Sequence, residues 1–227
     1  MGATGEKTGG SGSLKQRVQR RTRAFAIAGA TALGWLNLGM PADLAGLLHS
    51  PLPARVISAA SVLLGLLVAA LDALPGPNLK AQIVFLRRRH PLPASRAFER
   101  ANLDSDTRID RERLRALVGG TFPRAPGEQN ATWYRLYKER EGDPRVEHAQ
   151  FQWLLFRDLT WLALVLLALA LAATVANAHA RMPAFGGAVA ALVVVLAFRR
   201  AAAVLATRFV NTTLALASTA TPTSPQD

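Results

Sequence analysis

The sequence predicts an all-α, polytopic membrane protein in which two transmembrane hairpins, about four helices in total, flank a small helical soluble insert. Half of the 227 residues are hydrophobic, and they gather in long runs. Charged residues make up 19% of the chain but are almost absent from those runs. A helix needs about 20 apolar residues to cross a hydrocarbon core of about 30 Å. The runs approach that length, which favours membrane spans over buried helices of a soluble protein.

The first 74 residues contain an arm and a hairpin. Residues 1–23 are Gly-rich and then strongly basic, which predicts a disordered basic N-terminal arm. Residues 24–74 predict the first transmembrane hairpin, with spans at about 24–40 and 55–74. Pro51 and Pro53 lie in the turn between the two spans, and Pro75 and Pro77 follow the second span.

Residues 75–158 are polar and predict the soluble insert. We expect a helix over 79–89, a short helix from Ser95 to Asn102, a helix that begins near Asp106 or Asp110, and a helix over 128–141. Gly119 and Gly120 should end the third of these. Asp143 followed by Pro144 is a strong helix start, and that helix can continue unbroken into the membrane.

Residues 159–206 predict the second transmembrane hairpin. Its spans are expected at about 159–176 and from 184 to 198 or a little beyond, with a short turn between them. Residues 207–227 are expected to form a C-terminal tail.

The distribution of basic residues predicts which side of the membrane the loops face. The net charge is +12, and six of the basic residues lie in the arm, sixteen in the insert and three at the C-terminal end. The two short turns hold only Arg55 and Arg181. Since Lys and Arg concentrate in cytoplasmic loops, both termini and the insert are expected in the cytoplasm. The same rule explains the excess of positive charge without nucleic acid, which is therefore not an expected partner.

The residues that commonly carry chemistry are sparse. The chain has no cysteine, which excludes disulfides, thiolate catalysis and cysteine-ligated metals. The four histidines are scattered and have no metal-ligand neighbour at helical spacing. No phosphate-binding loop or nucleophile motif occurs. We therefore predict no catalytic residue, no metal and no cofactor.

The helix expected over 128–141 carries the most distinctive side chains. Gln129 and Asn130 form an amide pair, and Trp133, Tyr134 and Tyr137 follow on a short helix. Such a cluster could bind a nucleotide-like signal or a protein partner. A small apolar core inside the insert is the alternative, and it is the commoner role for aromatics at this spacing.

Three charged residues lie at the expected border between membrane and insert. Asp72, near the end of the second span, could pair with an arginine of the insert or remain a carboxylate with access to water. Arg157 and Asp158 lie where the long helix enters the bilayer. They could fasten the insert to the membrane helices, or simply contact lipid headgroups.

Four segments carry a resemblance: LPASRAF (Leu92–Phe98), DTRIDRERL (Asp106–Leu114), PGEQNATWYRLYK (Pro126–Lys138) and HAQFQWLLFRD (His148–Asp158). Together they resemble a group of uncharacterised bacterial multi-pass membrane proteins with paired spans on either side of a similar insert. The resemblance covers about residues 74–167. It implies the bacterial inner membrane, and no functional residue carries over from it.

The leading functional hypothesis is a non-enzymatic protein of the bacterial inner membrane. Its insert would bind a partner or signal, and its helices would associate in the bilayer as a homo-oligomer or with another protein; a membrane-perturbing effector is one version. A small channel or transporter is the first alternative, although Asn37 is the one strongly polar residue well inside a span. A membrane-bound enzyme that acts on headgroups through Asp72, His90 or Glu128 is the second.

Overall fold

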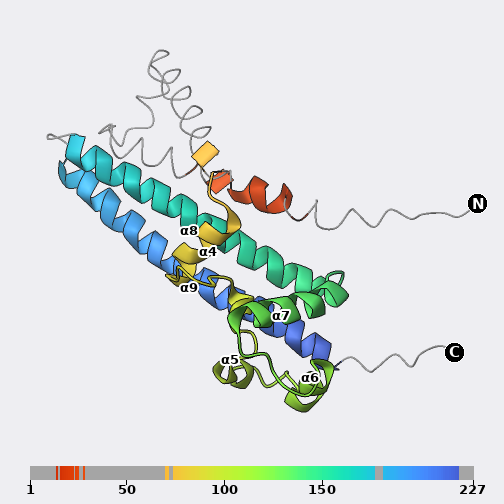
Figure 1. Ribbon diagram of the computed structural model, residues 1–227. Helices are drawn as coiled ribbons and strands as arrows, with labels where there is room; N and C mark the ends of the chain where they lie inside the picture. The colour runs from red at the N-terminus through yellow and green to blue at the C-terminus, as the bar shows by residue number, and fades with distance from the viewer. Residues whose placement is uncertain are drawn as a thin grey trace, which may run out of the picture.

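Two long antiparallel helices dominate the computed structural model, which describes Leu14 and residues 16–22, 24–25, 28, 70–71, 74–176 and 181–219. They are α8 (Pro144–Ala176) and α9 (Arg181–Thr219), and they lie side by side over their whole length (Figure 1). Shorter helices gather around the end where α8 begins and α9 finishes. The part of the chain described here is helical with connecting turns, in agreement with the predicted all-α class.

The start of α8 follows from its first residues. The Asp143 Oδ1 accepts a hydrogen bond from the Arg145 amide at 2.8 Å, and Pro144 takes the first helical position, where its missing N–H costs nothing. From there the helix continues for 33 residues without a break. The prediction of one helix that starts at Asp143-Pro144 and continues unbroken through the apolar run at 159–176 is confirmed.

The first half of the insert is less regular than expected. Helix α4 (Pro77–Phe85) ends earlier than the predicted residue 89, because Leu86 adopts a left-handed conformation with φ 52°. The predicted helix from Ser95 to Asn102 is instead a 3-10 turn, η1 (Pro93–Arg96), followed by the separate helix α5 (Arg100–Asp104). The Phe98 amide donates to the Gln129 side chain at 3.1 Å, so it is not available to continue a helix.

In the second half of the insert, the helices begin and end close to the residues that the sequence predicts. Helix α6 (Arg111–Leu117) is capped by Asp110, whose carboxylate accepts from two backbone amides at 3.1 Å each. It ends before Gly119 and Gly120, both with φ +88°, a conformation that glycine adopts without strain. Helix α7 (Pro126–Arg140) then carries the amide and aromatic residues.

The core of the insert is completed by the C-terminal half of α9. Ala202, Ala206, Phe209, Val210 and Leu214 belong to the same buried cluster as the apolar side chains of α4 to α7. Helices α4, α6 and α7 all contact α9, and α4 also contacts α8. The insert therefore packs directly on the hairpin and shares its apolar core, and it is not a separate domain (Figure 1).

The structure differs from the sequence-based expectation at both ends of the chain. Residues 207–219, expected to begin a tail, are the last turns of α9, because Phe209, Val210 and Leu214 are buried under the insert. Residues 16–22, assigned to a disordered arm, are helical, because Val18 and Thr22 are buried. We call residues 16–22 the N-terminal helix. The predicted spans at 24–40 and 55–74 lie almost entirely outside the described residues.

Two helices are long and apolar enough to cross a membrane, over Pro144–Ala172 of α8 and Phe185–Thr219 of α9. At 1.5 Å per residue the 39 residues of α9 extend about 58 Å, almost twice the hydrocarbon thickness of about 30 Å. Only part of α9 can therefore lie in a bilayer. Most of its exposed large apolar side chains lie between Phe185 and Leu196.

Candidate functional site

Gln129, Trp133 and Tyr137 share one face of α7 at four-residue spacing, and all three are buried. The Gln129 side chain accepts from the Phe98 amide and donates to the Arg124 carbonyl at 3.2 Å, which joins two loops of the insert. The Trp133 indole N–H donates to the Val210 carbonyl of α9 at 3.3 Å. These predicted interaction residues are therefore part of the core, the alternative that the sequence left open.

Aromatic rings fix α7 against α9. The Trp133 ring lies edge-on to Phe209 with 5.2 Å between centroids and is stacked on Tyr137 at 5.4 Å. Edge-to-face and offset pairs of this kind contribute about 0.5–1.5 kcal/mol beyond simple burial. The sequence analysis did not single out Phe209, because it lay in the expected tail.

The Tyr137 hydroxyl is enclosed and lies 3.2 Å from both the Glu141 and the Gln150 side chains. Burial, reinforced by the negative charge of Glu141, raises the pKa of Tyr137 from 10.0 to about 12. The phenol is therefore neutral at physiological pH. Its role is to connect the end of α7 with the second turn of α8.

A second stripe on α7 faces outward. Asn130, Tyr134 and Lys138 follow one another at the same four-residue spacing, one position along from the buried stripe. Tyr134 is 51% exposed, and the Lys138 ammonium lies 5.7 Å from its ring centroid. Lys138 also pairs with Glu141 at 2.8 Å. Of the aromatic residues predicted on this helix, Tyr134 is thus the one available to a partner.

The border between the insert and the apolar end of the hairpin is held by a buried ionic cluster. Asp158 is 8% exposed, and its Oδ1 lies 3.3 Å from the Lys80 ammonium of α4. The Arg157 guanidinium contacts the same oxygen at 2.9–3.0 Å and lies 5.9 Å from the Trp153 ring. Arg157 and Asp158 thus lie together, as the sequence suggested, and Lys80 supplies the link to the insert. Asp72 lies outside the described residues.

A second link joins α4 to α9 at the same level. The Arg199 guanidinium donates to the Val84 carbonyl at 3.1 Å, beyond the C-terminal end of the apolar stretch of α9. Lys80 and Arg199 were both missed as site residues. Lys80, Ala81 and Val84 are the buried residues of α4. Lysine is almost never fully buried unless its charge has a partner, so a lysine among apolar residues on one helix face is the signal that could have indicated its role.

Polar residues near the C-terminal end of α9 hold the far side of the insert. The Asn211 amide donates to the Ser105 hydroxyl at 3.1 Å, and the Ser218 hydroxyl accepts from the Asp110 amide at 3.1 Å. Both contacts join residues more than 100 positions apart in the sequence. They explain why the last turns of α9 belong to the insert and not to a tail.

No group of three or more potential metal ligands occurs among the described residues. Comparison of the chain with protein-family models, curated proteins and solved structures gave no match.

Proposed function

We propose that this chain is a non-enzymatic, multi-pass protein of the bacterial inner membrane that transmits binding of a partner or signal from its cytoplasmic insert to its membrane helices. One observation carries the proposal: α8 and α9 each run without interruption from the core of the insert into an exposed apolar end. A contact made on the insert therefore acts on the same two helices that would enter the bilayer.

The distribution of charge supports the orientation. Arg199 and Arg200 follow the apolar stretch of α9, and the insert carries most of the other basic residues. The N-terminal helix and the insert lie along the part of the hairpin that reaches from its middle to the end where α8 begins and α9 finishes (Figure 1). Under the positive-inside rule this end faces the cytoplasm. The predicted hairpin over 24–74 would complete a four-span bundle with both termini on that side.

Two surfaces are available for association. In the bilayer, the uncovered side chains of α9, such as Leu192, Val193 and Leu196, would pack on another helix of this protein or of a second copy. In the cytoplasm, Tyr134 offers an exposed aromatic ring flanked by Asn130 and Lys138. Tyrosine is enriched at protein interfaces because it adds a large contact area and one polar group.

A photo-reactive phenylalanine analogue at position 134 tests the cytoplasmic contact in the full chain, expressed in bacterial inner membranes. The control places the same analogue at Arg113, an exposed position on α6. We expect a discrete cross-linked product in the membrane fraction from position 134 and a much weaker one from position 113. Equal products from both positions, or none from 134, would contradict the proposed contact surface.

A further inference from the structure

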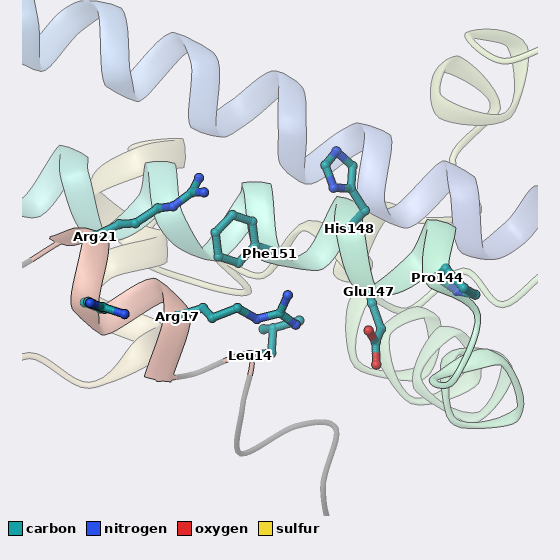
Figure 2. A pocket seen from close by; sticks show the side chains of 8 residues that line it. Leu14, Arg17, Arg21, Pro144, Glu147, His148 and Phe151 are labelled. Atoms are coloured by element: carbon teal, nitrogen blue, oxygen red, sulfur yellow. The ribbon is translucent and has the colours of Figure 1, made fainter.

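A groove lies between the N-terminal helix and the first turns of α8, with a volume of about 540 Å³ (Figure 2). Arg17, Arg20 and Arg21 line one wall, and Glu147, His148 and Phe151 line the other. Figure 2 shows Arg17 and Arg21 extending from the N-terminal helix toward α8, with Phe151 between that helix and His148. Three guanidinium groups thus face a single carboxylate.

The arginines are held on a helix with a fixed position. Leu14, Val18 and Thr22, again four residues apart, are buried. Beyond them Phe25 packs edge-on against Phe198 of α9, with 5.3 Å between centroids. The Arg21 guanidinium lies over the Phe151 ring at 5.2 Å. The N-terminal helix therefore runs parallel to α8 and presents its basic face to the groove.

The positive charge in the groove has few acidic neighbours among the residues that the structure describes. The other basic residues that lie near acidic ones form close pairs, such as Arg108 with Asp106 and Arg145 with Asp143. Among the described residues, Arg17, Arg20 and Arg21 form no ion pair. Like charges three or four residues apart on a helix repel each other. A bound anion would relieve that repulsion.

Phosphate is the anion that this arrangement suits. Guanidinium groups match the spacing of phosphate oxygens and form paired, charge-assisted hydrogen bonds with them. The groove falls in the range of about 300–1,000 Å³ that small-molecule sites occupy, so it has room for more than an inorganic ion. Phe151 and Leu14 supply an apolar contact for an organic group.

The distance from the membrane distinguishes a soluble phosphate from a lipid headgroup. Asp158 is the charged residue of α8 nearest to its apolar end, and Phe151 and His148 precede it by seven and ten residues. At 1.5 Å per residue, Phe151 and His148 lie about 10 and 15 Å farther from the apolar end of the hairpin than Asp158 does. The headgroup layer adds only about 5–8 Å on each side of the hydrocarbon core. The groove therefore opens above the headgroups.

We propose that this groove binds a water-soluble organic phosphate on the cytoplasmic side, with Arg17, Arg20 and Arg21 contacting the phosphate. The N-terminal helix leads into the predicted first hairpin, and Phe151 belongs to the helix that leads into the second. The bound anion would hold the two together. Binding itself does not depend on the proposed partner contact at Tyr134, so the two proposals can fail separately.

Isothermal titration of the full chain with pyrophosphate, in nanodiscs of zwitterionic lipid, tests the site directly. We expect binding that the Arg17→Gln/Arg20→Gln variant weakens by about tenfold or more, since each lost contact is a hydrogen bond between charged groups. The matched control, Arg100→Gln/Arg113→Gln, removes the same charge from exposed positions of the insert and should leave binding unchanged. Glu147→Gln should tighten binding, a gain that a misfolded variant could not produce.

The remaining outcomes contradict the proposal in distinct ways. Absence of pyrophosphate binding would exclude a phosphate site in the groove. Equal weakening by the control variant would mean that bulk charge alone attracts the anion. Loss of pyrophosphate binding in nanodiscs of anionic lipid at the same ionic strength would identify the headgroup, not a soluble phosphate, as the occupant.

Discussion

The two halves of α9 are both rich in apolar residues but differ in their surroundings. From Phe185 to Phe198 the helix exposes its valines and leucines, whereas from Arg199 to Thr219 most of its apolar side chains are enclosed by the insert. The candidate span that hydropathy indicates, Phe185–Thr219, includes both halves. Hydropathy reports the preference to leave water, and it does not distinguish lipid from protein as the destination. The length of the helix and the placement of Arg199 and Arg200 are what favour lipid as the destination of the first half in the proposed arrangement.

The covered half also explains how such a small insert can be ordered. Helices α5 and α6 have five and seven residues, and helices that short are marginal in water on their own. They are ordered because α9 supplies the apolar surface on which they pack. In the proposed arrangement, one end of the hairpin would lie in the membrane, and the other end is the central core element of the insert.

The largest difference between the halves is expected from one pair of leucines. Leu214 in the covered half is 0% exposed, and Leu196 in the other half is 53% exposed. Leu214→Ala should lower the free energy of unfolding by about 3–5 kcal/mol, because it leaves a cavity. Leu196→Ala should cost less than about 1 kcal/mol, because lipid or detergent fills the space. Thermal unfolding in detergent micelles, followed by tryptophan fluorescence, measures both, and equal losses would refute the distinction.

The ionic cluster at the border between the halves should come next in size. Asp158→Asn removes the negative charge that both Lys80 and Arg157 contact, and it should lower the free energy of unfolding by about 2–3 kcal/mol. The double variant Lys80→Met/Asp158→Leu should recover part of that loss, because Arg157, the more exposed of the two basic residues that contact Asp158, is then the one left without this carboxylate. Denaturant titration of each variant provides the comparison. A double variant less stable than Asp158→Asn would show that the charges stabilise the border in themselves.

Adjacent residues on α7 separate the buried stripe from the exposed one. Trp133→Phe removes the hydrogen bond to Val210 and part of the ring contact, and it should destabilise the insert by about 1–2 kcal/mol. Tyr134→Phe should change stability by less than about 0.5 kcal/mol. Both follow from the same unfolding measurement. A larger effect at Tyr134 would place that ring in the core.

The smallest expected effect concerns the titration of the Tyr137 hydroxyl, which ultraviolet absorbance measures. The chain has two tyrosines, so Tyr134→Phe leaves Tyr137 as the only one. Its ultraviolet titration should have a midpoint near the raised pKa of about 12, compared with about 10 in the unfolded chain. Because the folded-state pKa is the higher of the two, this stabilisation is complete below about pH 10 and is lost as pH rises toward 12. A midpoint near 10 in the folded protein would mean that the hydroxyl is open to water.

Local signals in the sequence predicted much of the fold, and long-range packing accounts for what they missed. Asp110, Asp143-Pro144 and the two glycines at 119 and 120 act on their own neighbours, so the starts of α6 and α8 and the end of α6 were readable. The continuation of α9 beyond residue 206 depends on contacts with segments about 100 residues earlier, which no local pattern reveals.

In the candidate site too, local signals predicted some features, and long-range packing accounts for the others. The sequence placed Gln129, Trp133 and Tyr137 on one short helix, but whether they form a core or a binding surface depended on Phe209 of α9. The pairing of Arg157 with Asp158 was visible from their adjacency. Its third member, Lys80, and the basic groove of the N-terminal helix both require parts of the chain that only the folded structure brings together.

Cysteine labelling at two valines of α9 tests the central claim most directly. Val193 and Val204 are 60% and 51% exposed, and they lie about three turns apart on nearly the same face. Since the chain has no cysteine, Val193→Cys and Val204→Cys each give a single thiol. In membrane vesicles with the cytoplasmic face outward, a water-soluble maleimide should label position 204 readily and position 193 only after denaturation. Equal labelling of both positions in intact membranes would show that the exposed end of the hairpin lies in water and would contradict the account.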